Sequence, residues 1–120
     1  IYDFLKFQNL GKKLNFFKNK KIDLKHKGFD TTYIVKKNSR NFVGSLKNNN
    51  SNVQVDFFSN LPGVQLYSAQ NLNYKKKLFP YQGICLETQY FPDTPNKKNF
   101  PSTLIKANKR YTCFTKIKIY

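Results

Sequence analysis

Apolar and polar residues alternate along most of this chain with the period of two that is typical of β-strands. The alternating runs are rich in β-branched and aromatic residues, and turn-forming residues separate them. No run has the period of a helix longer than a turn or two. The pattern predicts an all-β, antiparallel protein, built as a sandwich or a barrel. We expect its strands over residues 29–35, 42–46, 53–58, 64–68, 84–89 and 111–120, the last giving the clearest signal.

The N-terminal part of the chain has a less regular pattern. Tyr2–Phe7 alternates enough for a short strand, which Asn9-Leu10-Gly11 would interrupt. Residues 12–27 are rich in lysine, and their few apolar residues fit neither a clean helix nor a clean strand. We expect a surface connection there, with one helical turn at most.

Two connections between the predicted strands have characteristic turn residues. Lys47–Asn52 contains only Lys, Asn and Ser, which predicts a hairpin loop between the strands on either side. Leu61-Pro62-Gly63 predicts a tight turn, in which Pro62 presets one dihedral angle and Gly63 takes a positive φ. Prolines interrupt residues 91–102, where we expect an irregular loop.

The length and composition allow one hydrophobic core. The chain has 120 residues, of which 39% are hydrophobic. No stretch approaches the ~18 consecutive apolar residues of a membrane helix, and the N-terminus has no signal-peptide pattern. Since the sequence starts at Ile1 and contains no methionine, we expect it to be a piece of a longer protein.

The formal charge of +16 raises the question of an anionic partner, either nucleic acid or a membrane surface. Every basic residue except Arg40 and Arg110 is lysine, whereas phosphate and base recognition favours the bidentate guanidinium group. Asparagine is abundant as well, so a general compositional bias accounts for the lysines equally well. Nucleic acid is therefore the less favoured partner, and we expect no membrane interaction.

The two cysteines, Cys85 and Cys113, lack the spacing of a metal site. One disulfide between them is conceivable, but nothing else in the sequence indicates secretion. We expect reduced, buried thiols and a cytoplasmic protein.

The clearest candidate for chemistry is Glu87, the only glutamate of the chain. It lies in the alternating run Gly83-Ile84-Cys85-Leu86-Glu87-Thr88-Gln89, where period-two geometry places it on one face with Cys85 and Gln89. Strands disfavour glutamate, so a functional carboxylate is one interpretation. A charge that simply faces solvent is the other.

Ordered sequence blocks resemble the C-terminal part of the aldose 1-epimerase (galactose mutarotase) family. The blocks are Tyr2-Asp3-Phe4 with Leu10-Gly11-Lys12, Lys27-Gly28-Phe29-Asp30, Asn60-Leu61-Pro62-Gly63-Val64-Gln65-Leu66-Tyr67-Ser68, the run around Glu87 with Phe91-Pro92-Asp93 and Asn96, and Asn99-Phe100-Pro101-Ser102-Thr103-Leu104. They extend over nearly all of residues 1–120. The resemblance therefore implies the C-terminal portion of a single domain, with a twisted antiparallel β-sandwich that is incomplete in this chain.

The resemblance also implies roles for three residues. Glu87 corresponds to the general base that removes the proton of the anomeric hydroxyl of a hexose. Asp30 would hold sugar hydroxyls, and Gln65 would line the same pocket. A proton donated to the ring oxygen opens the ring, and reclosure after rotation gives the other anomer. This chemistry requires neither a metal nor an organic cofactor.

Two departures from the family pattern concern the remainder of the site. Thr31 follows Asp30 where the family usually has histidine. The general acid of the family is a histidine from an earlier segment, which also provides a second histidine and an arginine for sugar binding. The only histidine here, His26, matches none of those motifs. We therefore expect the missing N-terminal part of the same protein to be a partner of this chain.

Two alternatives stay open at this stage. A catalytically inactive β-sandwich that binds carbohydrate or serves in assembly would also lack the acid. A basic, nucleic-acid-associated β protein is the less favoured alternative, because it depends on charge alone.

Overall fold

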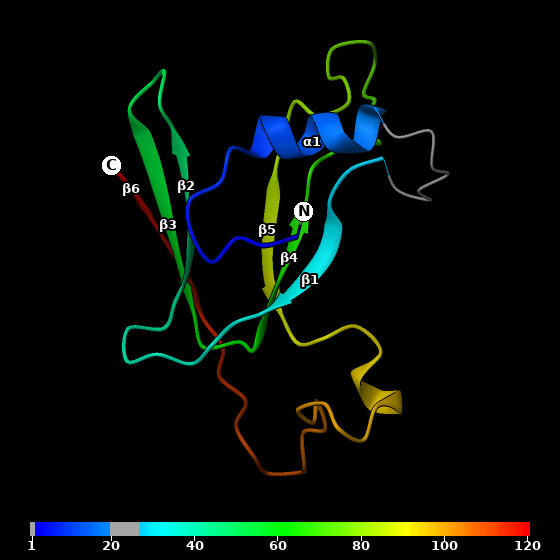
Figure 1. Cartoon of the computed structure of the whole chain (residues 1–120). Helices are drawn as coiled ribbons and strands as arrows, with labels where there is room; N and C mark the ends of the chain where they lie inside the picture. The colour runs from blue at the N-terminus through cyan, green and yellow to red at the C-terminus, as the bar shows by residue number, and fades with distance from the viewer. Residues whose placement is uncertain (1, 20–26) are drawn as a thin grey trace. The chain divides into compact units, whose positions relative to one another are not determined.

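The computed structural model describes residues 2–19 and 27–120, which form mainly β-structure (Figure 1). The strands and the helix are short, and most connections between them are irregular. In chain order the elements are α1 (Leu10–Asn19), β1 (Asp30–Ile34), β2 (Phe42–Asn48), β3 (Val53–Ser59), β4 (Gly63–Tyr67), β5 (Cys85–Gln89), the 3-10 helix η1 (Thr94–Asn96) and β6 (Thr115–Ile119).

The strands form two three-stranded antiparallel sheets, with orders β1-β4-β5 and β2-β3-β6. The predicted all-β class is therefore confirmed, and so are the strands expected from residue 29 to residue 89. The chain divides into two compact units, which are described separately. The first contains Ile1–Thr31 and Leu66–Cys85, and the second contains Thr32–Gln65 and Leu86–Tyr120.

The expectation for the N-terminal region was wrong in two places. Residues 2–9 contain no strand; instead, the Leu5 amide donates to the Asp3 carboxylate at 2.9 Å and forms a turn. Asn9 does not interrupt structure but begins α1, because its side-chain oxygen accepts the Lys12 amide at 2.9 Å as an N-cap. Residues 12–19, where a surface connection was expected, belong to this ten-residue helix, and residues 20–26 of the expected connection lie outside the described residues.

Phe29 is the centre of the core of the first unit and is 0% exposed. The rings of Tyr2 and Phe4 pack edge-on against it, with centroids 5.9 and 5.4 Å away. The ammonium of Lys13, on α1, lies 4.9 Å from the Phe4 ring centroid. Tyr2 and Phe4 thus pack on Phe29 as single aromatic side chains rather than as part of a strand.

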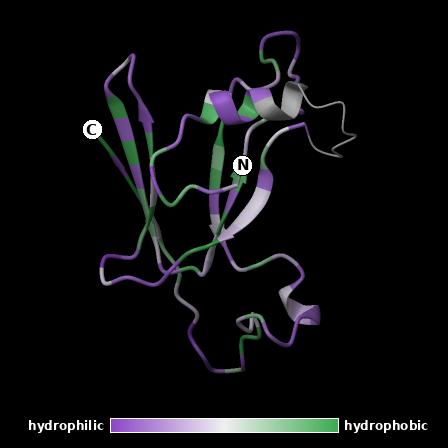
Figure 2. Cartoon of the chain, viewed as in Figure 1, coloured by the Kyte–Doolittle hydropathy of each residue, from purple (hydrophilic) through white to green (hydrophobic). Residues whose placement is uncertain are grey.

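The second sheet lies within the second unit and begins as the predicted hairpin. Strands β2 and β3 pair antiparallel across the Asn-rich loop, with a bulge between Phe42 and Gly44. Strand β6 pairs antiparallel with the other side of β3. The alternation of apolar and polar residues along β3 is visible as coloured bands in Figure 2.

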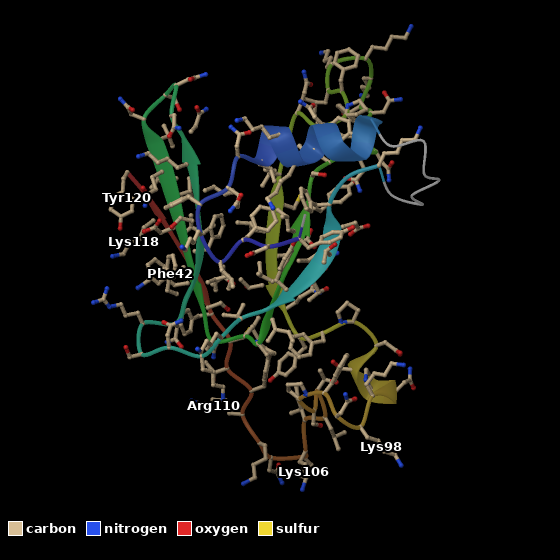
Figure 3. All side chains as sticks on the ribbon, in the orientation of Figure 1. Phe42, Lys98, Lys106, Arg110, Lys118 and Tyr120 are labelled. Carbon is tan, nitrogen blue, oxygen red and sulfur yellow. The ribbon has the colours of Figure 1, made fainter. Side chains whose placement is uncertain are left out.

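Strand β6 is shorter and more exposed than its sequence suggested. Residues 111–114 are not in a strand, and all five residues of β6 are exposed. Ile117 and Ile119 are 54% and 71% exposed, although they lie opposite Phe57 and Val55 of β3. Lys118 and Tyr120 project outward at this edge of the sheet (Figure 3).

Two smaller expectations also require correction. No glycine of the described chain has a positive φ, so Gly63 does not make the predicted turn in that way. Both cysteines are free, but only Cys85 is partly buried, whereas Cys113 is exposed. Among the described residues, no helix is both long and apolar enough to cross a membrane.

Candidate active site

Gln65 and Glu87 lie on neighbouring strands of the first sheet. Gln65 is on β4, where it is half-buried between the buried residues Val64 and Leu66. Glu87 is the exposed middle residue of β5. The exposure of Glu87 leaves its carboxylate accessible to a small molecule.

A close approach at Gly63 fixes how β4 meets β5. A Cβ atom at Gly63 would lie 3.0 Å from the Phe91 ring and 3.2 Å from the backbone oxygen of Gln89. Glycine is therefore required here for lack of space and not for an unusual dihedral angle. Gln65 lies two residues after Gly63 on β4, and Glu87 lies two residues before Gln89 on β5. Because the strands are antiparallel, both residues lie on the same side of this contact. The segments that carry them therefore run side by side.

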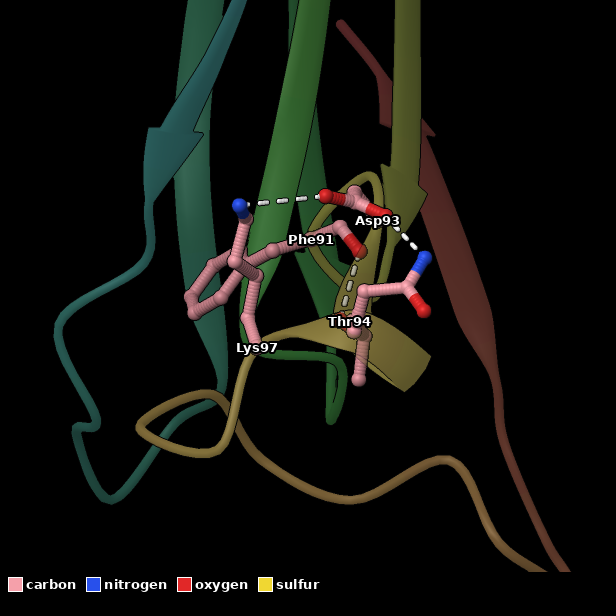
Figure 4. Close-up of polar contacts among 5 residues, drawn as sticks. Phe91, Asp93, Thr94 and Lys97 are labelled. Atoms are coloured by element: carbon pink, nitrogen blue, oxygen red, sulfur yellow. Dashed lines mark hydrogen bonds and ion pairs between the residues drawn. The ribbon is translucent and has the colours of Figure 1, made fainter.

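The loop after β5 is fixed by its own polar contacts (Figure 4). Asp93 has a left-handed backbone with φ 62°, and its carboxylate accepts from the Asn96 amide at 2.5 Å and pairs with Lys97 at 3.3 Å. The buried Thr94 hydroxyl donates to the Phe91 carbonyl at 2.6 Å. Phe91 is thereby held against Gly63, which anchors the end of β5 beyond Glu87.

Gln65 is oriented by a neighbour that the sequence did not single out. The Thr32 hydroxyl, on β1, donates a short hydrogen bond to the Gln65 side-chain oxygen. The alternation of β1 places Thr32 on the same face as Asp30, which was the only signal available for it.

Asp30 is the first residue of β1 and belongs to the first unit. Its side chain is exposed, while Gly28 and Phe29 directly before it are buried. The backbone of Phe29 is hydrogen-bonded in both directions to Ser68, with Phe29 N to Ser68 Oγ at 2.8 Å and Ser68 N to Phe29 O at 3.0 Å. Asp30 therefore follows a rigid segment.

Two surface grooves occur in the second unit, and neither is lined by a candidate residue. The larger, about 600 Å³, lies along residues 94–104. The smaller, about 290 Å³, has Tyr90 and Tyr111 among its lining residues. Partial burial raises the pKa of Tyr111, and a hydrogen bond with Cys113 adds to this effect. The described chain thus carries the candidate side chains without an enclosed pocket around them.

The described residues contain no group of three or more His, Cys, Asp or Glu side chains that could hold a metal ion. His26, the only histidine of the sequence, lies outside the described residues. An acid partner for Glu87 therefore has no candidate histidine within residues 2–19 and 27–120.

Comparison with known proteins decides the family. The sequence model of the aldose 1-epimerase family matches residues 2–118. The chain belongs to the aldose 1-epimerase family. Galactose mutarotase of Mus musculus is 30% identical over 98 residues, which are 76% of this chain and 29% of that protein. The human galactose mutarotase is 29% identical over 117 residues, 92% of this chain and 32% of that protein.

The chain thus spans about a third of the length of these curated aldose 1-epimerase relatives. A chain that covers about a third of its relatives is consistent with the two small sheets and with the exposed position of Glu87. Asp30, Gln65 and Glu87 remain predictions as site residues, and the sheet places Gln65 and Glu87 on the adjacent strands β4 and β5.

Proposed function

We propose that this chain carries the base and part of the sugar-binding residues of an aldose 1-epimerase that interconverts the α and β anomers of hexoses such as galactose or glucose. The observation that carries the proposal is that the exposed Glu87 on β5 and Gln65 on β4 lie on adjacent strands of one sheet. Family membership gives this pair its chemical context.

The reaction needs one proton acceptor and one proton donor. Glu87 takes the proton of the anomeric hydroxyl while an acid protonates the ring oxygen, and the bond between C1 and the ring oxygen breaks. Rotation about C1–C2 presents the other face of the aldehyde, and the reverse proton transfers close the ring. Gln65 and Asp30 hold sugar hydroxyls during these steps. The acid comes from a part of the protein outside this chain, and that part is the partner we propose.

Polarimetry of freshly dissolved α-D-galactose tests the proposal, using the complete protein and the 120 residues alone. We expect the complete protein to speed mutarotation and the chain alone to leave the spontaneous rate unchanged. Glu87→Gln should lower kcat about 10²- to 10⁴-fold, as expected for loss of a positioned base. Asp93→Asn is the matched control, because it removes a carboxylate in the same stretch and the left-handed backbone there tolerates asparagine.

An unchanged rate for Glu87→Gln in an active protein would refute the assignment of the base. Sugar binding without turnover by the complete protein would instead favour the carbohydrate-binding alternative. Full activity of the isolated chain would show that no further part is needed.

A further inference from the structure

Three consecutive residues before Asp30 are each held by a different contact in the first unit. The Tyr81 hydroxyl donates to the Lys27 carbonyl at 2.6 Å. Gly28 lies directly against the side chains of Ser68 and Gln70. Phe29 exchanges two hydrogen bonds with Ser68. The backbone that leads into Asp30 therefore has little freedom to move.

Ser68 is the centre of these contacts and is 1% exposed. Its oxygen accepts the Phe29 amide at 2.8 Å, and its hydroxyl donates to Gln70 Oε1 at 2.9 Å. Its own amide donates to the Phe29 carbonyl at 3.0 Å. Both backbone groups of Phe29 are thus satisfied by one buried residue.

The backbone changes direction after β4, which explains why a side-chain oxygen rather than a backbone carbonyl accepts the Phe29 amide. Strand β4 ends at Tyr67, and Ala69 has a left-handed backbone with φ 52°. The Ala69 carbonyl turns to accept the amides of Leu72 at 3.1 Å and Tyr81 at 2.9 Å. The Ser68 hydroxyl accepts the Phe29 amide in the place of a strand carbonyl.

The absence of a side chain at Gly28 allows this arrangement. A Cβ atom there would lie 2.5 Å from Ser68 Oγ and 2.8 Å from Gln70 Oε1. Neither side chain can withdraw without breaking its hydrogen bonds. The Gly-Phe-Asp sequence is therefore fixed against Ser68 by shape as well as by hydrogen bonds.

We infer that Ser68 is a positioning residue that aims Asp30 at the sugar through the backbone of Phe29. The inference rests on the proposed function, in which Asp30 holds sugar hydroxyls. Ser68 itself does not touch the sugar. The Ser68 hydroxyl fixes the peptide that precedes Asp30. Removal of this hydroxyl should therefore lower the affinity for the sugar only while the Asp30 carboxylate is present.

A double-mutant cycle in the complete protein tests this inference, with the Kd of D-galactose measured by titration calorimetry. Ser68→Ala should raise the Kd about tenfold or more, since small displacements of a binding group are costly. Ser68→Thr keeps the hydroxyl and should restore much of the affinity. In an Asp30→Ala background, Ser68→Ala should have no further effect on the Kd.

Ser59→Ala is the matched control. Ser59 is 3% exposed in the second unit, donates to the Phe114 carbonyl at 2.8 Å and accepts the Leu61 amide at 3.1 Å. Ser59→Ala therefore removes the same kind of buried hydrogen bonds to the backbone, and we expect this variant to lower Tm without changing the Kd of D-galactose.

Additive effects of Ser68→Ala and Asp30→Ala would overturn the inference, as would a lower Tm with an unchanged Kd for Ser68→Ala. Polarimetry on the same samples separates this inference from the proposed function. A wild-type protein that binds galactose but does not speed mutarotation refutes the reaction, while the cycle of Kd values still decides the role of Ser68.

Discussion

Strands β4 and β6 are both five residues long but differ completely in burial. In β4, Gly63, Val64 and Leu66 are buried and Gln65 and Tyr67 are half-buried, whereas every residue of β6 is exposed. Strand β4 lies between two partners, and β6 forms the edge of its sheet. The more buried of the two strands is therefore the one that carries the candidate residue Gln65. The apolar face of β6 is left uncovered by the described residues.

Truncation of one apolar side chain on each strand gives the largest expected difference. Leu66 on β4 is 6% exposed, and Leu66→Ala should lower the free energy of unfolding by about 2–5 kcal/mol through loss of burial and formation of a cavity. Ile119 on β6 is 71% exposed, and Ile119→Ala should cost about 0.5 kcal/mol or less. Urea unfolding of the two variants checks this. Similar losses would mean that another part of the protein covers β6.

The next largest difference in stability is expected between two variants that each add a methyl group at a strand glycine. Gly63→Ala should lower the free energy of unfolding by about 1–3 kcal/mol, because the Phe91 ring and the Gln89 backbone occupy the space. Gly44→Ala on β2 meets nothing within 4 Å, and should be neutral or slightly stabilising. Thermal unfolding of both variants measures the difference, and an equal Tm would contradict the close contact between β4 and β5.

The segment that leads into β6 is held by the side chain of Asn60, which follows β3, and loss of this side chain should have a smaller effect on stability. The Asn60 side chain donates to the Thr112 carbonyl at 3.1 Å and accepts the Phe114 amide at 3.0 Å. Asn60→Ala should cost about 1–2 kcal/mol and speed amide hydrogen exchange in β6. Exchange in β4 should stay unchanged. Faster exchange in both strands would show that the two regions unfold together.

The smallest effect is expected at acid pH. Hydrogen bonds from the Ser45 hydroxyl and then the Gln54 amide hold the pKa of Asp56 below its ordinary value of 3.8, and Lys118 of β6 adds to this. The contribution of the carboxylate to stability is therefore fully present above pH 3.8 and is lost as the pH falls through the lowered pKa. Asp56→Asn should flatten the dependence of Tm on pH in that range. The same decrease of Tm at acid pH in Asp56→Asn and in the wild type would contradict a contribution of the Asp56 carboxylate to stability.

Much of the β-structure could be predicted from the alternation of apolar and polar residues. In strands such as β3 and β4 one face is more buried than the other, and apolar residues are favoured on that face. The helix α1 could not, since its cap Asn9 was taken as a break and the lysine-rich sequence around it hides its short apolar repeat. The strand expected at Tyr2–Phe7 failed for a related reason. Tyr2 and Phe4 pack on Phe29 rather than in a sheet, and Phe7 is exposed.

The candidate site was only partly predictable. The family motifs identify Asp30, Gln65 and Glu87, which remain predictions as site residues. Thr32 lies outside those motifs, and Ser68 ends one of them without an assigned role, because small hydroxyl residues are common in strands and turns. Their importance depends on which backbone or side-chain group each one meets, and alternation within one strand does not specify that.

The position of β6 in the sequence has a consequence for folding kinetics. The hairpin of β2 and β3 closes through a short loop, and such local pairing forms within about 1–10 μs. The contacts that bring β6 to β3 join residues much farther apart, as Ser59 and Phe114 are 55 positions apart. Closing that long loop costs entropy before the new pairing compensates for it. Strand β3 should therefore spend the early stage of folding with one edge open, a period in which it is able to pair with the wrong strand.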